Sequence, residues 1–224
     1  MSDGDLLAAE EITIYFAAVD WLTELVSRDE VAHAWAEPSA LSRYSIGGVA
    51  AHALIGAVLR LAQLVEEPEP SERRRVGIPE AFSPNRMARP DDDDPLFVML
   101  RSGSEQLAER GPAALLETCA APYARLAVVL PESRADRAVS LVRVPDGQMS
   151  LRDYLRTRLL EIVVHGDDLV ASIEGWEPTD PPPQAVSVCL QVCLQLAQAQ
   201  AGGVGALRAF TREERAVPGA LRVL

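Results

Sequence analysis

The sequence predicts an all-α protein, an antiparallel helical bundle with a short helical C-terminal extension. Apolar residues recur three and four positions apart over several long stretches, which is the spacing of helices that each bury one face. Turn residues and prolines separate these stretches, and only one short segment alternates like a strand. The 224 residues are 48% hydrophobic, which is enough to bury one full core, so we expect one main domain.

The longest of these helices is predicted over residues 151–172. Ser150 is a favourable N-cap with Asp153 three residues on, and Gly175 provides a stop signal. Helical spacing gives this segment an apolar stripe beside a polar one. The polar stripe consists of Tyr154, Arg158, Glu161, His165, Asp168 and Ser172. Because apolar residues interrupt it, we expect the polar stripe to face a cavity inside the bundle.

The other helices follow from the same periodicity. We expect them at residues 6–27, 46–66, 95–109, 112–130 and 184–201, with a last short helix at 206–215. Ser45 caps the second of these, which is apolar around much of its circumference. Gly202 and Gly203 stop the helix that precedes the last one.

Three connecting segments complete the predicted organisation. Residues 67–95 carry prolines and runs of like charge, so we expect a long loop that is either a functional lid or disordered. Residues 138–144 alternate with β-branched residues and end in the turn signal of residues 145–147, which predicts a short extended segment. The proline-rich stretch 178–183 predicts a linker between a bundle, residues 1–175, and a small extension, residues 176–224.

Charge and hydropathy exclude several classes of partner. The net charge of −12 and the pI near 4.7 argue against binding to nucleic acid or to an acidic membrane surface. We find no apolar run of the length that spans a bilayer and no basic segment typical of a signal peptide, so we expect a cytoplasmic protein. The sequence is compatible with either a monomer or a homodimer.

Cys119, Cys189 and Cys193 are too few for a disulfide framework. Cys189 and Cys193 share a helix face and could be metal ligands, although free cysteine is more often a small buried apolar residue. His33 precedes a predicted loop, and we interpret it as a surface or packing residue.

Glu161 and His165 are four residues apart on one helix, so their side chains can converge on one ion. His52 lies within an apolar helix and is the natural third ligand. Together they would form a His₂Glu site with one open position, as in catalytic zinc sites. The alternative is a buried hydrogen-bonded pair and a satisfied core histidine.

Two charged residues lie one turn away from this pair on the same helix. Asp168 could support His165 or act as a base, and Arg158 could hold an anion. The alternative for both is a network of ion pairs within the helix.

Two motifs together resemble a known family. Residues 35–54 (WAEPSALSRYSIGGVAAHAL) and 158–169 (RLLEIVVHGDDL) are similar to the metal-binding domain of the mycothiol-dependent maleylpyruvate isomerase family, within the DinB-like superfamily of four-helix metal-binding bundles. The similarity covers about residues 5–175. It implies a DinB-like antiparallel four-helix bundle, a functional role for Asp168, and a divalent metal, usually zinc, on His52, Glu161 and His165.

The resemblance also implies the chemistry. The metal would receive the thiol of mycothiol and lower its pKa, so that the thiolate could add to a small electrophile as an S-transferase or a cis-trans isomerase. The isomerase has a larger C-terminal domain that contributes an arginine to the substrate, whereas about 40 residues follow the linker here. We therefore expect a substrate carboxylate to be held by Arg158 or by one of the C-terminal arginines, Arg208, Arg212, Arg215 and Arg222.

Two other functions remain open at this point. A metal-dependent hydrolase of the same fold would activate water in place of the thiol. A non-catalytic metal-binding or ligand-binding protein would bind tightly without turnover.

Overall fold

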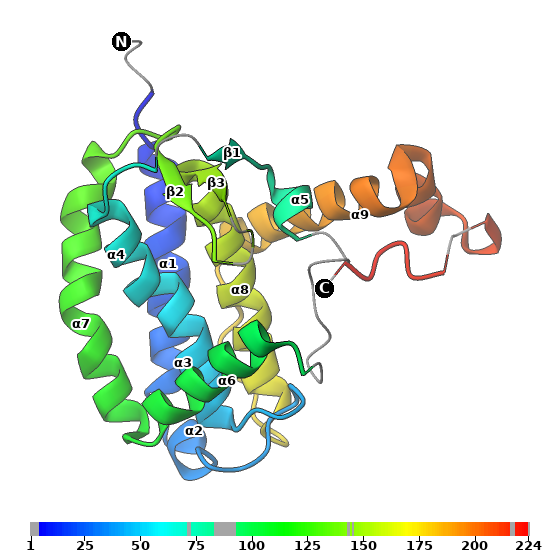
Figure 1. Cartoon of the computed structure of the whole chain (residues 1–224). Helices are drawn as coiled ribbons and strands as arrows, with labels where there is room; N and C mark the ends of the chain where they lie inside the picture. Colours follow the sequence, from blue (N-terminus) through cyan, green and yellow to red (C-terminus); the bar gives the residue numbers. More distant parts are fainter. Residues whose placement is uncertain are drawn as a thin grey trace.

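The computed structural model describes residues 5–70, 73–82, 93–142, 144, 146–215 and 218–223. It confirms the all-α prediction. Figure 1 shows the long helices running side by side as a bundle: α1 (Ala9–Val26), α3 (Ile46–Leu54) with its continuation α4 (Leu61–Glu66), α7 (Gly111–Val129) and α8 (Leu151–Ala171). A π-helical segment, Ile55–Arg60, joins α3 to α4. The helix α6 (Pro95–Ala108) packs on α3.

One continuous core holds the bundle together. Its largest fully buried side chains come from every long helix of the bundle, and they include Tyr15, Leu22, Leu54, Leu61, Leu126 and Leu160. Gly166 on α8 leaves room for the Trp21 side chain of α1, because a Cβ atom there would lie 2.2 Å from the Trp21 ring. A side chain at this position would displace the Trp21 ring from α8, the helix that carries His165.

The predicted helix starts are confirmed. The Ser45 side chain accepts a hydrogen bond from the Gly48 N–H, and the Ser150 side chain accepts one from the Asp153 N–H. These caps satisfy N–H groups that have no partner within their own helix. Helix α8 ends at Ala171, before Gly175, whose φ is +73°.

A small sheet precedes α8, and the sequence predicted only part of it. Its order is β1 (Arg74–Arg75), β3 (Gly147–Ser150), β2 (Ala138–Ser140), with β2 antiparallel to β3 and β1 parallel to it. The extended segment at 138–144 corresponds to β2, whereas β1 and β3 were not expected. Both are too short for an alternating pattern, and only their mutual pairing makes them strands.

The predicted long loop at residues 67–95 is wrong in part. It contains β1 and a short helix, α5 (Ile78–Ala81), while residues 71–72 and 83–92, which include Asp91 and Asp92, lie outside the described residues. Another short helix, α2 (Asp29–His33), also escaped prediction because one turn is too short to show a period.

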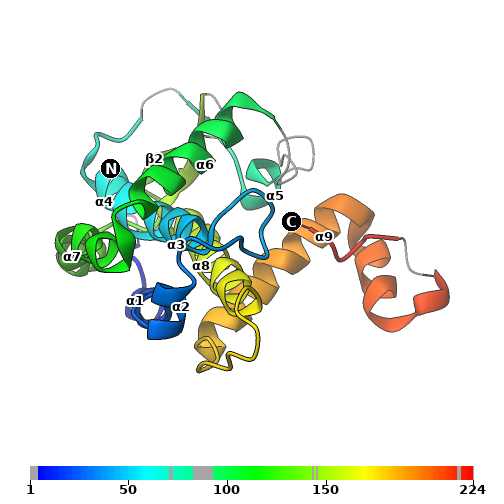
Figure 2. The same cartoon turned by 90° about the horizontal axis from the view of Figure 1, so that it is seen from below.

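The C-terminal element α9 (Pro183–Thr211) consists of two helices that meet at a kink. At Gly202 the backbone is not helical, with φ +73° and ψ 156°, so the predicted stop at this glycine is confirmed. The first part of α9 packs on α8 through buried residues that include Ala185, Cys189 and Val192. The part beyond Gly202 projects from the bundle in both views (Figures 1 and 2).

Within the described residues, two helical stretches are long and apolar enough to span a bilayer by composition, contrary to the expectation from the sequence. They are Ile46–Glu66 and Gly111–Glu132. The more apolar window, in Ile46–Glu66, is 67% buried inside the bundle, as is usual for a core helix of a folded domain.

Candidate metal centre

The structure brings the three predicted metal ligands together. His52 projects from α3, and Glu161 and His165 project from successive turns of α8. Glu161 Oε2 lies 3.2 Å from His165 Nε2 and 3.8 Å from His52 Nε2. Each of the three residues offers one ligand atom, and these atoms all lie within 4.8 Å of one another. Among the described residues, no other group of three His, Cys, Asp or Glu side chains has this arrangement.

This donor set fits a divalent metal. Two imidazole nitrogens and one carboxylate oxygen are the ligands of catalytic zinc, and donors about 2 Å from an ion are typically somewhat more than 3 Å apart. The side chains of His52, Glu161 and His165 are 16%, 12% and 13% exposed, so water cannot fully solvate the carboxylate. A metal would therefore compensate a partly buried charge and leave one coordination position open.

A second partner fixes the orientation of each histidine. Asp168 Oδ2 lies 2.9 Å from Nδ1 of His165. Ser104 Oγ lies 3.5 Å from Nδ1 of His52 and donates its own hydrogen bond to the Leu100 carbonyl at 2.8 Å. The network therefore assigns the proton to Nδ1 of both rings, which directs both Nε2 atoms toward Glu161.

Helix α6 also anchors the start of α3, the helix of His52. The Glu105 carboxylate accepts a hydrogen bond from the Ser45 N–H at 2.8 Å and another from the Ser45 hydroxyl at 2.7 Å. A carboxylate at a helix N-terminus is also favoured by the helix dipole. Neighbouring residues of α6, Ser104 and Glu105, thus hold both the helix and its histidine.

His165 is unusually basic in the metal-free protein. Burial of the ring by itself favours the neutral form, but hydrogen bonds to Asp168 and Glu161 outweigh burial and raise the pKa of His165 to about 9. A metal and a proton therefore compete for the Nε2 atom of this residue.

This pKa predicts how the stability of the metal-free protein depends on pH. Because the folded pKa lies above the ordinary value of 6.5, protonation stabilises the fold fully below pH 6.5 and not at all above about pH 9. We expect the free energy of unfolding to fall by on the order of 3 kcal/mol across this window. Urea denaturation at a series of pH values measures it. A His165→Asn variant should lack this fall, and an equal fall in the variant would contradict the assignment.

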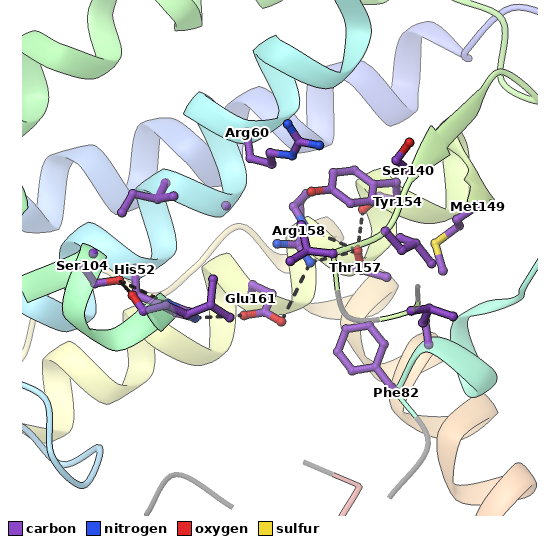
Figure 3. A pocket seen from close by; sticks show the side chains of 18 of the residues that line it. His52, Arg60, Phe82, Ser104, Ser140, Met149, Tyr154, Thr157, Arg158 and Glu161 are labelled. Atoms are coloured by element: carbon purple, nitrogen blue, oxygen red, sulfur yellow. Dashed lines mark hydrogen bonds and ion pairs between the residues drawn. The ribbon is translucent and has the colours of Figure 1, made fainter. Parts of the chain in front are cut away.

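The centre opens into a cavity of about 300 Å³ (Figure 3). His52 and Glu161 lie at one end of it, and Arg60, Tyr154 and Arg158 lie farther along. Most of the remaining wall is apolar and comes from the π-helical segment, α6, the β2–β3 connection, β3 and the residue after α5. These residues are Ile55, Phe82, Met99, Leu100, Leu141 and Met149. The cavity suits a small molecule with an apolar body and a polar or anionic end.

Arg158 is held in this cavity by several weak contacts. Its Nε and NH2 atoms lie 3.3 Å from Thr157 Oγ1, its guanidinium lies 4.8 Å from the centre of the Tyr154 ring, and NH2 lies 3.9 Å from Glu161 Oε1. Gly56 makes room for it, because a Cβ atom there would lie 2.8 Å from NH1. The side chain is only 16% exposed.

The structure distinguishes between the arginines that the sequence left open. Arg158 lines the cavity, whereas within the described part of the chain no C-terminal arginine does so. Sequence reasoning missed Arg60 and Ser104. The spacing in the sequence could have identified Arg60, because His52, Gly56 and Arg60 recur every four residues on one helix face. No such spacing could have identified Ser104, because it lies on α6 and not on the helix of His52. The structure leaves His33 exposed on α2, away from the cavity lining.

The three native cysteines should be poor nucleophiles. Burial raises the pKa of Cys119 to about 11 and that of Cys189 to about 12, and it also raises the pKa of Cys193. We expect alkylation of the two buried thiols by iodoacetamide at neutral pH to be about a hundredfold slower in the native than in the unfolded chain, because the thiolate is the reactive form. Rapid modification of Cys119 or Cys189 in the native protein, located by peptide mass spectrometry, would contradict this prediction.

Comparison with known proteins identifies one matching family. A family model described as the mycothiol maleylpyruvate isomerase N-terminal domain matches residues 16–170. This segment is more than half of the chain, and it contains the three candidate ligands, Arg158 and Asp168. No curated protein and no solved structure matches the chain.

Proposed function

Because this chain belongs to the family of the mycothiol maleylpyruvate isomerase N-terminal domain, we propose that it is a cytoplasmic enzyme that uses a metal, most simply zinc, and a mycothiol-type thiol. Its reaction is S-transfer to a small electrophile or cis-trans isomerisation of one. The observation that carries the proposal is the convergence of His52, Glu161 and His165 at the end of a cavity that can admit a small molecule.

The chain's own residues have separate tasks in this proposal. His52, Glu161 and His165 hold the metal, which when bound lowers the pKa of a coordinated thiol so that it is a thiolate near neutral pH. Asp168 and Ser104 keep the proton on Nδ1 of each histidine, so each Nε2 presents its lone pair. The apolar walls limit access of water to the electrophile.

Arg158 is the residue that we assign to the electrophile. Its guanidinium lines the cavity and can form paired hydrogen bonds with a carboxylate. If a thiolate added to an alkene conjugated with that carboxylate, a C–S bond would form and the electron pair of the double bond would move toward the carboxylate. Arg158 would stabilise this charge. Rotation about the resulting single bond and expulsion of the thiolate would complete an isomerisation, whereas protonation of the carbon by water would complete a transfer.

The test is a titration of zinc-loaded protein with mycothiol by calorimetry in buffers of different ionisation enthalpy. We expect binding of one thiol per chain with release of a proton, and loss of both in His52→Ala. Consumption of an unsaturated carboxylate should then require the thiol. Turnover without any thiol would favour the hydrolase, and binding without turnover of any electrophile would favour a binding protein.

We expect Asp168 to affect the affinity for zinc by orienting the His165 ring. Replacing it with asparagine removes the carboxylate that accepts from Nδ1, and we expect the affinity for zinc to fall by about 10- to 100-fold, as is typical for a residue that orients a ligand. Competition with a fluorescent chelator measures this loss. Asp167→Asn is the matched control, because Asp167 is the exposed neighbour on the same helix. Equal affinities of the two variants would remove Asp168 from the site.

A further inference from the structure

The last part of α9 and the residues that directly follow it form a projecting arm with an uncovered apolar face. We define the C-terminal arm as residues 203–215; its helical part is the end of α9, beyond the kink at Gly202. Val204, Leu207 and Phe210 recur every three residues along it and are 63%, 61% and 62% exposed. Figures 1 and 2 both show this part extending away from the bundle. Because so short a helix is not stable in isolation, a continuous apolar stripe on it indicates a partner.

The arm also differs from the rest of the chain in charge. It contains three arginines and two glutamates, whereas the whole chain carries a net charge of −12. Arg208 and Arg212 are exposed at the end of the helical part, close to the apolar stripe. The partner surface should therefore be apolar with an acidic border.

The bundle offers such a surface on the face of α8 that is turned away from the metal centre. A groove of about 720 Å³ lies there between α1, α8 and the chain that leads into α9. We call it the Trp176 groove; its apolar lining includes Trp21, Val163, Val164, Val170, Trp176 and Val186.

The Trp176 groove is complementary to the arm in polarity and in charge. Asp167, Glu177 and Asp180 are exposed at its border, and within the described part of the chain no basic side chain lines it. Trp21 is held in place by a hydrogen bond from its indole N–H to the Thr179 carbonyl at 2.8 Å. The wall is therefore built before any partner arrives, which lowers the entropy lost on binding.

We propose that two copies of this chain form a two-fold symmetric dimer in which the arm of each copy lies in the Trp176 groove of the other. Leu207 and Phe210 contact the tryptophan and valine side chains, and Arg208 and Arg212 pair with the acidic border. Two-fold symmetry forms this contact twice, so that both apolar stripes are covered in one closed assembly.

Sedimentation equilibrium of the full chain tests the proposal. We expect twice the monomer mass of 24.2 kDa for the wild type. Val204→Asp and Leu207→Asp should raise the dissociation constant at least tenfold, about the effect of losing an interface anchor. The matched control is Val128→Asp, since Val128 is 60% exposed on α7 and outside both surfaces; it should leave the mass unchanged.

Charge reversal identifies the groove as the acceptor. The double variant Glu177→Arg, Asp180→Arg should dissociate the dimer, and adding Arg208→Asp with Arg212→Asp should restore it. Circular dichroism of each variant checks that the bundle remains folded. A monomeric wild type at high concentration, or a dimer insensitive to the arm substitutions, overturns the proposal. If the dimer requires the arm but persists when the charges of the groove border are reversed, the Trp176 groove is not the surface that binds the arm.

Discussion

Replacing Glu161 with alanine is expected to abolish stoichiometric zinc binding. Glu161 Oε2 lies between the Nε2 atoms of His52 and His165, so it is the only anionic donor of the proposed set. Its loss leaves two neutral donors, and we expect the affinity for zinc to fall by more than about a hundredfold, the upper range for a residue that only orients a ligand. Mass spectrometry of metal in purified protein should find about one zinc per wild-type chain and almost none in the variant.

The control for this experiment is Glu117→Gln, which changes an exposed glutamate on α7 and should retain the metal. His52→Ala should behave like Glu161→Ala, although the two residues are far apart in the sequence. Circular dichroism should show that both variants remain helical, because the apolar core does not include these side chains. Absence of metal from the wild type under every loading condition would reduce the three residues to a buried polar cluster.

Replacing Gly56 with alanine should impair the reaction without touching the metal. The new Cβ would lie 2.8 Å from NH1 of Arg158, so the flexible guanidinium must move, while the backbone of the π-helical segment has no reason to shift. For an electrophile with a carboxylate, we expect kcat/KM to fall about ten- to hundredfold, the size of a lost charge-assisted hydrogen bond. Steady-state kinetics with a saturating thiol measure this change.

Gly103→Ala is the matched control, because Gly103 lines the same cavity and a Cβ there would meet no atom within 4 Å. It should leave kcat/KM nearly unchanged. The methyl ester of the same electrophile provides a second control, since it lacks the charge that Arg158 would bind. If Gly56→Ala slows the ester as much as the acid, Arg158 does not recognise a carboxylate.

The local features of this chain were predictable because their causes are local. The caps at Ser45 and Ser150 depend on residues within one turn, and the long apolar periods of α1 and α8 lie entirely within each helix. By contrast, β3 is a strand only because β1 and β2 pair with it.

For the candidate site too, only the residues that share one helix were placed together by their spacing in the sequence. Spacing on one helix placed Glu161, His165, Arg158 and Asp168 on a common stripe, and the structure retains that order along α8. His52 was associated with them by its apolar helix and by the family motifs, not by any spacing, because more than a hundred residues separate it from Glu161.

The sequence by itself thus determined an all-α chain, its main helix starts, and the polar stripe of α8. Only the tertiary structure decided that α3 sets His52 against that stripe, that Ser104 supports it from α6, and that Arg158 rather than a C-terminal arginine enters the cavity. The reason is physical: helix periodicity and capping are short-range properties of consecutive residues. The meeting of side chains from different helices depends on how the whole core packs.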